Sequence, residues 1–157
     1  MIAHQSNSNA TLNLDLRSGR RPAQDISSFA ISATDVLNVL SQFDPYGLWR
    51  MDVGTGLVHW SHDVYAIHGM EATDGGVDLA QAMSNYHPDD RKLMAQVIED
   101  SVKNKSAFRF VLRVMNRHGT YKLVKCTGLF RESEQGSPEI FGTYSEFQPA
   151  NRAIAAI

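Results

Sequence analysis

The stretch that decides the fold is residues 107–147, which read AFRFVLRVMNRHGTYKLVKCTGLFRESEQGSPEIFGTYSEF. Its first nine residues alternate with a period of two, which puts an aromatic and aliphatic row on one face of a strand. Gly119 can take the positive φ of a tight turn, and the Gln-Gly-Ser-Pro segment at 135–138 breaks the chain again. We therefore predict three consecutive antiparallel strands, at about 107–115, 121–131 and 140–147, with one buried face.

A hairpin and several helices are predicted before this meander. Residues 47–53 and 57–60 are typical of two short strands joined by a Gly-Thr-Gly turn. Short helices are expected at 63–68 and 78–86. A longer helix begins at Pro88, followed by two aspartates that complement the positive end of the helix dipole. This order predicts an α+β domain, a five-stranded antiparallel sheet with helices packed over one face.

An amphipathic helix is predicted in front of the domain, within residues 29–45. Ser32 or Thr34 can cap its start, and Asp44-Pro45 stops it. Its apolar stripe needs a partner: its own domain, the outer face of the sheet, or the same helix in a second subunit. The stripe consists of Ala33, Val36, Leu37, Leu40 and Phe43.

The ends of the chain are predicted to be tails, at residues 1–28 and 149–157, around a domain at 46–148. Leu12, Leu14 and Leu16 alternate as in a strand, so the alternative to a flexible N-terminal tail is a strand that pairs with a free sheet edge. The Arg- and Ser-rich start is also compatible with an organelle transit peptide, but it shows no amphipathic helix. We favour a flexible tail.

The composition indicates a soluble, cytoplasmic protein. The 157 residues are 43% apolar, which suits one domain with tails, and the net charge of −2 gives no general attraction to nucleic acid or to anionic membranes. Cys126 is the only cysteine, so no internal disulfide forms, which fits a reducing compartment. No apolar run approaches the roughly 20 residues of a membrane span, and no secretory signal is evident.

Several small motifs, in this order and spacing, resemble the PAS domains of bacterial sensor kinases, from about Phe43 to Phe147. The chain departs from the family at His118 and Leu123, where an Asp and a Trp are usual, and at the closing segment 146–148. No kinase, cyclase or DNA-binding segment follows, so we expect a stand-alone module that signals through another chain. The motifs that carry the resemblance are Gly47-Leu48-Trp49, Asp52, Thr55-Gly56, Trp60-Ser61, His87-Pro88-Asp89-Asp90, Gly119, Gly128 and Gly142-Thr143.

The resemblance implies a pocket between the inner face of the sheet and the helices. The side chains there either fill a close-packed core or leave room for a small hydrophobic ligand or metabolite. The residues that the pattern turns towards this pocket are Trp49, Met51, Trp60, Phe108, Phe110, Leu112, Val124, Cys126 and Phe141.

The residues give little support for haem or a flavin, the cofactors that relatives in this family bind. Haem-binding relatives use a histidine on or near the longer helix, and residues 88–105 contain none. A flavin adduct needs a cysteine near the short helices, whereas Cys126 falls on a strand and is interpreted as an inert buried thiol. His59 and His62 have a spacing that could hold a metal, but without nearby cysteines we interpret them as surface residues. We predict no metal site and no required cofactor.

Catalysis is not predicted. The candidates are Ser61, the His62-Asp63 pair and the Asp89-Asp90 pair. Neighbours on a helix do not face one another, so Asp63 cannot orient His62 as a general base, and the two aspartates are explained by the helix dipole. The chain has neither a phosphate-binding glycine loop nor a nucleophile elbow.

The outward face of the meander is the predicted contact surface. It carries Val111, Met115, Tyr121 and Leu123, and the stripe of the preceding helix adds Val36, Leu37 and Leu40. An apolar patch on an open sheet face usually meets a partner. We expect a non-enzymatic sensory or regulatory module, acting as a homodimer or as an adaptor to a signalling protein such as a sensor histidine kinase. The first alternative is a chemosensor with a bound small molecule or cofactor, either haem or a metabolite, and the second alternative is a small enzyme.

Overall fold

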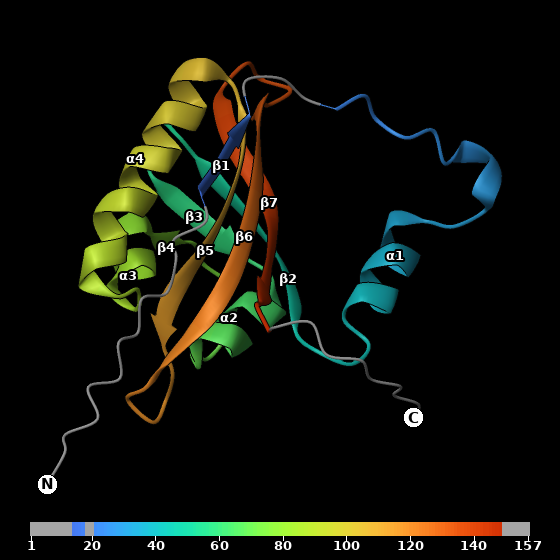
Figure 1. The fold of residues 1–157 in the computed structure, drawn as a ribbon. Coiled ribbons are helices and arrows are strands. Elements are labelled where there is room, and N and C mark those ends of the chain that lie inside the picture. Colours follow the sequence, from blue (N-terminus) through green and yellow to red (C-terminus); the bar gives the residue numbers. More distant parts are fainter. Residues whose placement is uncertain (1–13, 18–20, 149–157) are drawn as a thin grey trace, which may run out of the picture.

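A computed structural model describes residues 14–17 and 21–148 of the chain. One antiparallel sheet runs through it in the order β1-β5-β6-β7-β2-β3-β4. Helices α3 and α4 cover one face of the sheet, α2 lies near one end, and α1 stands away on the other side (Figure 1). The strands are β1 (Leu14–Arg17), β2 (Tyr46–Asp52), β3 (Leu57–Trp60), β4 (Val77–Asp78), β5 (Ala107–Met115), β6 (Tyr121–Glu132) and β7 (Pro138–Glu146).

The helices of the described residues are short, apart from one. They are the 3-10 turn η1 (Ser27–Phe29) and the α-helices α1 (Ala33–Leu40), α2 (His62–His68), α3 (Leu79–Ser84) and α4 (Pro88–Asn104). Gly69 ends α2 with a φ of 67°, and Asp78 caps α3 by accepting a hydrogen bond from the Gln81 N–H. No helix in this part of the chain is long and apolar enough to cross a bilayer.

The predicted meander and its buried face are confirmed. Phe110 of β5 pairs with Cys126 of β6, which pairs with Tyr144 of β7. All three residues are buried, as period-two alternation requires. The inner face of β5 consists of Phe108, Phe110, Leu112 and Val114, and every one of these side chains is buried.

The α+β class is confirmed, but the strand count was too low. The five predicted strands form the middle of the sheet, and β4 and β1 extend it at its two edges. The β4 strand has only two residues, which sequence reading assigned to a loop and a helix cap. Such a short strand leaves no periodic pattern to detect.

The β1 strand departs from the flexible tail predicted for residues 1–28. Its four residues pair antiparallel with Ala107–Phe110 of β5, which is the edge-pairing alternative considered above. The segment forms a strand because it pairs with β5, which is distant in sequence, so local composition could not predict it. Residues 1–13 and 18–20, with Leu12 among them, and the predicted C-terminal tail at 149–157 lie outside the described residues.

The predicted amphipathic helix is present as α1 but is shorter than expected. Ser32, not Thr34, is its N-cap, and a capping box joins Ser32 and Asp35. The helix ends at Leu40, before the Asp44-Pro45 stop, and none of its residues is buried. Packing of this helix onto its own domain is therefore not observed.

Asp90 has a different role from the one predicted. It is 2% exposed and accepts hydrogen bonds from the Arg113 guanidinium at 2.6 and 3.0 Å and from the Arg113 backbone N–H at 2.9 Å. Burial raises the pKa of this carboxyl, but the bonds from Arg113 outweigh it and hold the pKa below its ordinary value. The first turn of α4 is thus joined to β5, beyond any effect of the helix dipole.

Candidate functional site

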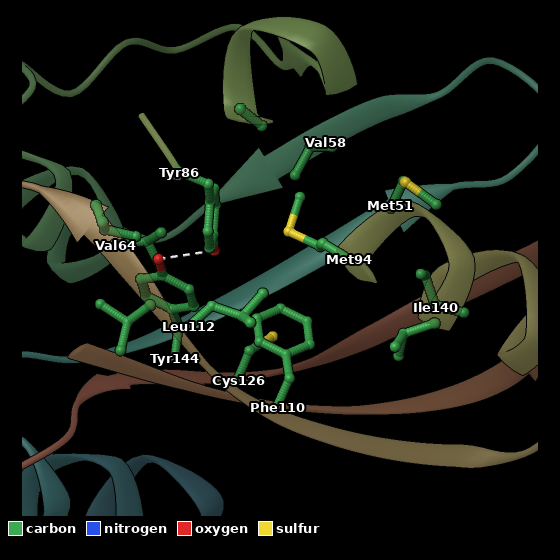
Figure 2. Close-up of a cluster of buried hydrophobic side chains, with 14 of the residues drawn as sticks. Met51, Val58, Val64, Tyr86, Met94, Phe110, Leu112, Cys126, Ile140 and Tyr144 are labelled. Atoms are coloured by element: carbon green, nitrogen blue, oxygen red, sulfur yellow. Dashed lines mark hydrogen bonds between the residues drawn. The ribbon is translucent and has the colours of Figure 1, made fainter. Parts of the chain in front are cut away.

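A cavity of about 50 Å³ lies between the inner face of the sheet and helices α2, α3 and α4. Figure 2 shows part of its wall, with Tyr86, Met94 and Phe110 turned towards one another above the strands. Of the predicted pocket residues, those that line it are Trp49, Met51, Trp60, Phe108, Phe110 and Cys126. The lining is completed by Val58, His68, Leu79, Ala82, Tyr86, Met94, Ile98 and Tyr144.

Three predicted pocket residues do not line this cavity. Leu112 and Val124 are buried in the core beside it. Phe141 lies on the opposite face of the sheet, in register with Arg50 and Leu129, and the Arg131 guanidinium lies 4.1 Å from its ring centroid. Ile140 takes the inner position instead. Because Ile140 and Phe141 are adjacent and both apolar, the alternation does not show which of the two side chains faces inward.

The size of the cavity limits what it holds. A single water needs roughly 10–15 Å³ of such space, so the cavity has room for a few waters or a few non-hydrogen atoms. A haem or a flavin ring is larger than this cavity. Among the described residues no group of histidine, cysteine or acidic side chains is placed to hold a metal ion.

His68, at the end of α2, is the main polar residue of the lining. It is 5% exposed, and its ring is stacked between Trp60 (centroids 4.5 Å apart) and Tyr144 (5.3 Å). Its Nδ1 atom lies 3.4 Å from the Asn85 side-chain nitrogen, whereas its Nε2 atom is buried without a hydrogen-bond partner. Burial, helped by the charge of Lys122, lowers the His68 pKa to about 4, so the ring is neutral at neutral pH.

Two tyrosine hydroxyls join the helical layer to the sheet beside His68. The Tyr86 O–H donates to the Tyr144 oxygen at 2.8 Å, the dashed line in Figure 2. Burial raises the pKa of both phenols well above the ordinary value, so both are uncharged. Burial likewise raises the pKa of the Cys126 thiol, which leaves it without thiolate character at neutral pH.

Sequence reading placed Tyr86 on the apolar face of the predicted helix at 78–86 and His68 too far from the longer helix to hold haem, and it gave neither of them nor Tyr144 a place in the pocket. A signal for His68 was present: it stands four residues after Val64 and three after Tyr65, and both of these side chains are buried. It therefore continues the apolar face of α2. The hydrogen bond between Tyr86 and Tyr144 left no signal in the sequence, because the two residues meet only through tertiary packing.

The residues weighed as catalytic candidates hold the backbone in place. The Ser61 hydroxyl accepts a hydrogen bond from the Leu48 N–H at 2.8 Å, and the Asp63 carboxylate accepts one from the Tyr46 N–H at 2.9 Å. The His62 side chain is exposed to solvent. The two acceptors fasten α2 to the start of β2, and neither is arranged with a base in a pocket.

The opposite side of the sheet, which we call the outer face, is the second candidate site. We define it by Leu48, Val111, Met115, Tyr121 and Leu123. Leu48, Met115 and Tyr121 are exposed, and Val111 and Leu123 are half-buried. The helix on this side of the sheet is α1, whose predicted contact residues Val36 and Leu40 are exposed (Figure 1). Leu37 is half-buried.

A family model matches more than half of the chain. The family model described as the PAS fold matches residues 57–144. No curated protein sequence matches the chain.

Three solved structures illustrate the likeness in fold. A sensory box histidine kinase/response regulator from Burkholderia thailandensis has 19% identity and a TM-score of 0.58, over 73% of this chain and 84% of that one. The domain of a putative light and redox sensing histidine kinase from Haloarcula marismortui has 16% identity and a TM-score of 0.58, over 73% and 99%. The N-terminal domain of a diguanylate cyclase with PAS/PAC sensor from Marinobacter aquaeolei has 13% identity and a TM-score of 0.56, over 64% and 94%. Since the matched segment covers more than half of the chain and the strand order and helical layer agree with it, the protein belongs to the PAS fold family.

Proposed function

We propose that this PAS domain is a sensory or regulatory module without catalysis of its own, which acts through protein contacts made by α1 and the outer face. The observation that carries the proposal is that α1 is a capped amphipathic helix with no buried residue. An isolated helix of eight residues is marginal in water, so its apolar stripe favours a partner surface. We also propose a cytoplasmic location, on the sequence grounds given above.

The partner that we propose is a second copy of the chain. Each copy offers a helix without buried residues and an apolar sheet face, on which Tyr121 contacts the His87 ring (centroids 4.8 Å apart) but stays exposed to solvent. A two-fold axis can then bury the same surfaces on both subunits, as most homodimers do. Leu48 of the outer face lies in β2, the strand that follows α1 in the chain, so helix and face can form one continuous patch. The alternative partner is a signalling protein in trans, such as a sensor histidine kinase.

The experiment replaces Tyr121 and Leu123 with glutamate and measures mass by light scattering after size exclusion. We expect the wild type to be a dimer and the double variant a monomer with an unchanged circular dichroism spectrum, because two charges on each face oppose burial. The matched control is Ala95→Glu with Gln96→Glu, which adds the same charge to exposed positions on α4. Equal masses for the wild type and the Tyr121/Leu123 variant would contradict the proposal.

A second candidate function is the sensing of a small molecule, favoured by the cavity and by the unpartnered nitrogen of His68. Binding there would act by population shift, favouring one arrangement of the helices on the sheet and so changing what α1 and the outer face present. The first test is an absorbance spectrum of the purified protein, followed by mass spectrometry of whatever denaturation releases. A bound small molecule in stoichiometric amount supports this function. Its absence directs the search to weakly bound ligands.

A further inference from the structure

We propose that the cavity receives a small uncharged molecule with a hydrogen-bond acceptor oxygen, which accepts a hydrogen bond from the Nε2–H of His68. This inference rests on the second function proposed above and specifies the chemistry of its ligand. The chemistry of the ligand follows from the protonation of His68, from the hydrogen bonds of the other polar groups in the lining, and from the size and charge of the cavity.

The contacts of Asn85 indicate which His68 nitrogen carries the proton. The Asn85 side-chain nitrogen lies 3.4 Å from the His68 Nδ1 atom and 3.5 Å from the Met70 sulfur, and both contacts suit a donor. Nδ1 is then the acceptor, and a neutral imidazole has its hydrogen on the other nitrogen. The Nε2 atom is therefore a donor that lacks an acceptor.

Two of the other polar groups of the lining already donate to partners. The Tyr86 hydroxyl donates to Tyr144, and the Trp49 indole N–H donates to the Thr143 carbonyl at 3.2 Å. Within the described residues, the His68 Nε2 atom is the buried side-chain nitrogen or oxygen left without a hydrogen bond. A buried donor without an acceptor is unfavourable, so a ligand that supplies an acceptor removes this penalty.

The remaining lining excludes a charged ligand. It holds no lysine, arginine, aspartate or glutamate, and a lone charge placed among aromatic and thioether groups would be strongly disfavoured. The ligand is therefore uncharged, with an apolar body. In this conformation only a few non-hydrogen atoms fit the 50 Å³. The side chains of Met51 and Met94 form part of the wall, and their flexible thioether chains can change rotamer to accept a larger body.

The test uses two probes of the same shape, acetone and isobutene, which differ in the acceptor oxygen. In the wild type we expect acetone, and not isobutene, to shift the ¹⁵Nε2–H signal of the His68 imidazole in NMR spectra. We expect the His68→Phe variant, which keeps an aromatic ring in the stack, to weaken acetone binding by about three- to tenfold, the value of one neutral hydrogen bond. Isobutene binding should change less than about twofold, because isobutene makes no such bond.

Each other outcome overturns the inference in a distinguishable way. Binding of isobutene together with an unmoved His68 signal in acetone leaves a sensor of purely apolar ligands. Equal weakening of both probes by His68→Phe assigns the residue to packing alone. Binding of neither probe, with water at the His68 Nε2 atom, removes the small-molecule function as well, whereas the dimer proposal is tested separately by mass. If the variant does not fold, the wild-type NMR result decides.

Discussion

At the residue scale, His68 lies in an environment that is unusual for a histidine. A histidine between two aromatic rings, 5% exposed, keeps its neutral form because a buried charge is poorly solvated there. Its pKa of about 4 lies below the ordinary value of 6.5. The unfolded chain therefore takes up this proton at a higher pH than the folded domain does.

This difference predicts how stability depends on pH. As the pH falls from 6.5 towards 4, the unfolded state binds a proton that the folded state rejects, so the free energy of unfolding decreases by about 3 kcal/mol over that window. Well above pH 6.5, where the unfolded state no longer binds this proton, the group makes no further contribution to the slope. Urea unfolding of the wild type and of His68→Phe, at several pH values from 7.5 to 4.5, measures it. We expect a flatter profile in the variant; parallel profiles would show that His68 does not titrate in this way.

Individual residues also show which features of the structure could and could not be predicted from the sequence. Period-two alternation correctly predicted which side chains of β5 form the buried inner row. It failed at Phe141, where the adjacent Ile140 is also apolar and the register with β6 decides which side chain is buried. His68 was within reach of the helical pattern of α2. The lack of a hydrogen-bond partner for its Nε2 atom could not be predicted, because it depends on where Asn85 and the rings of Trp60 and Tyr144 lie.

At the scale of elements, contacts distant in sequence decide how the helices and edges attach. The Met115 N–H donates to the Asn85 carbonyl, and the His87 N–H donates to the Arg113 carbonyl, so the segment before α4 is joined to β5. Asp90 completes this attachment through Arg113. Sequence reading predicted these helices from their caps and stops, but it could not predict what each cap residue binds. The same holds for β1, whose partner strand is some 90 positions away.

Removing the Asp90 carboxylate should therefore destabilise the domain far more than removing its neighbour. We expect Asp90→Ala to lower the free energy of unfolding by about 2–4 kcal/mol, because the Arg113 guanidinium and N–H both lose their acceptor. The matched control is Asp89→Ala, which alters an exposed carboxylate in the same helical turn and should cost about 0.5 kcal/mol. Chemical denaturation measures both variants. Similar losses would mean that the helix dipole, and not the attachment to β5, accounts for the acidic pair.

At the scale of the whole molecule, α2 connects the cavity to the proposed contact surface. Its last residue, His68, lines the cavity. At its start, Ser61 and Asp63 accept hydrogen bonds from the backbone at the beginning of β2, which follows α1 in the chain. Gly47 packs so closely on Val64 that a Cβ there would lie 2.3 Å from a side-chain carbon. These contacts fix α2 to the start of β2, the strand that follows α1 in the chain.

The account depends most on the outer face and α1 being a contact surface between copies of the chain. The most direct measurement is the relaxation of side-chain methyl groups by a soluble gadolinium chelate, recorded by NMR at two protein concentrations about a hundredfold apart. We predict that the methyls of Leu48, Val111 and Leu123 become protected at the higher concentration, while the exposed methyl of Ala95 on α4 stays accessible. If the three outer-face residues remain as accessible as Ala95 at both concentrations, the surface is not buried between copies and the central claim is wrong.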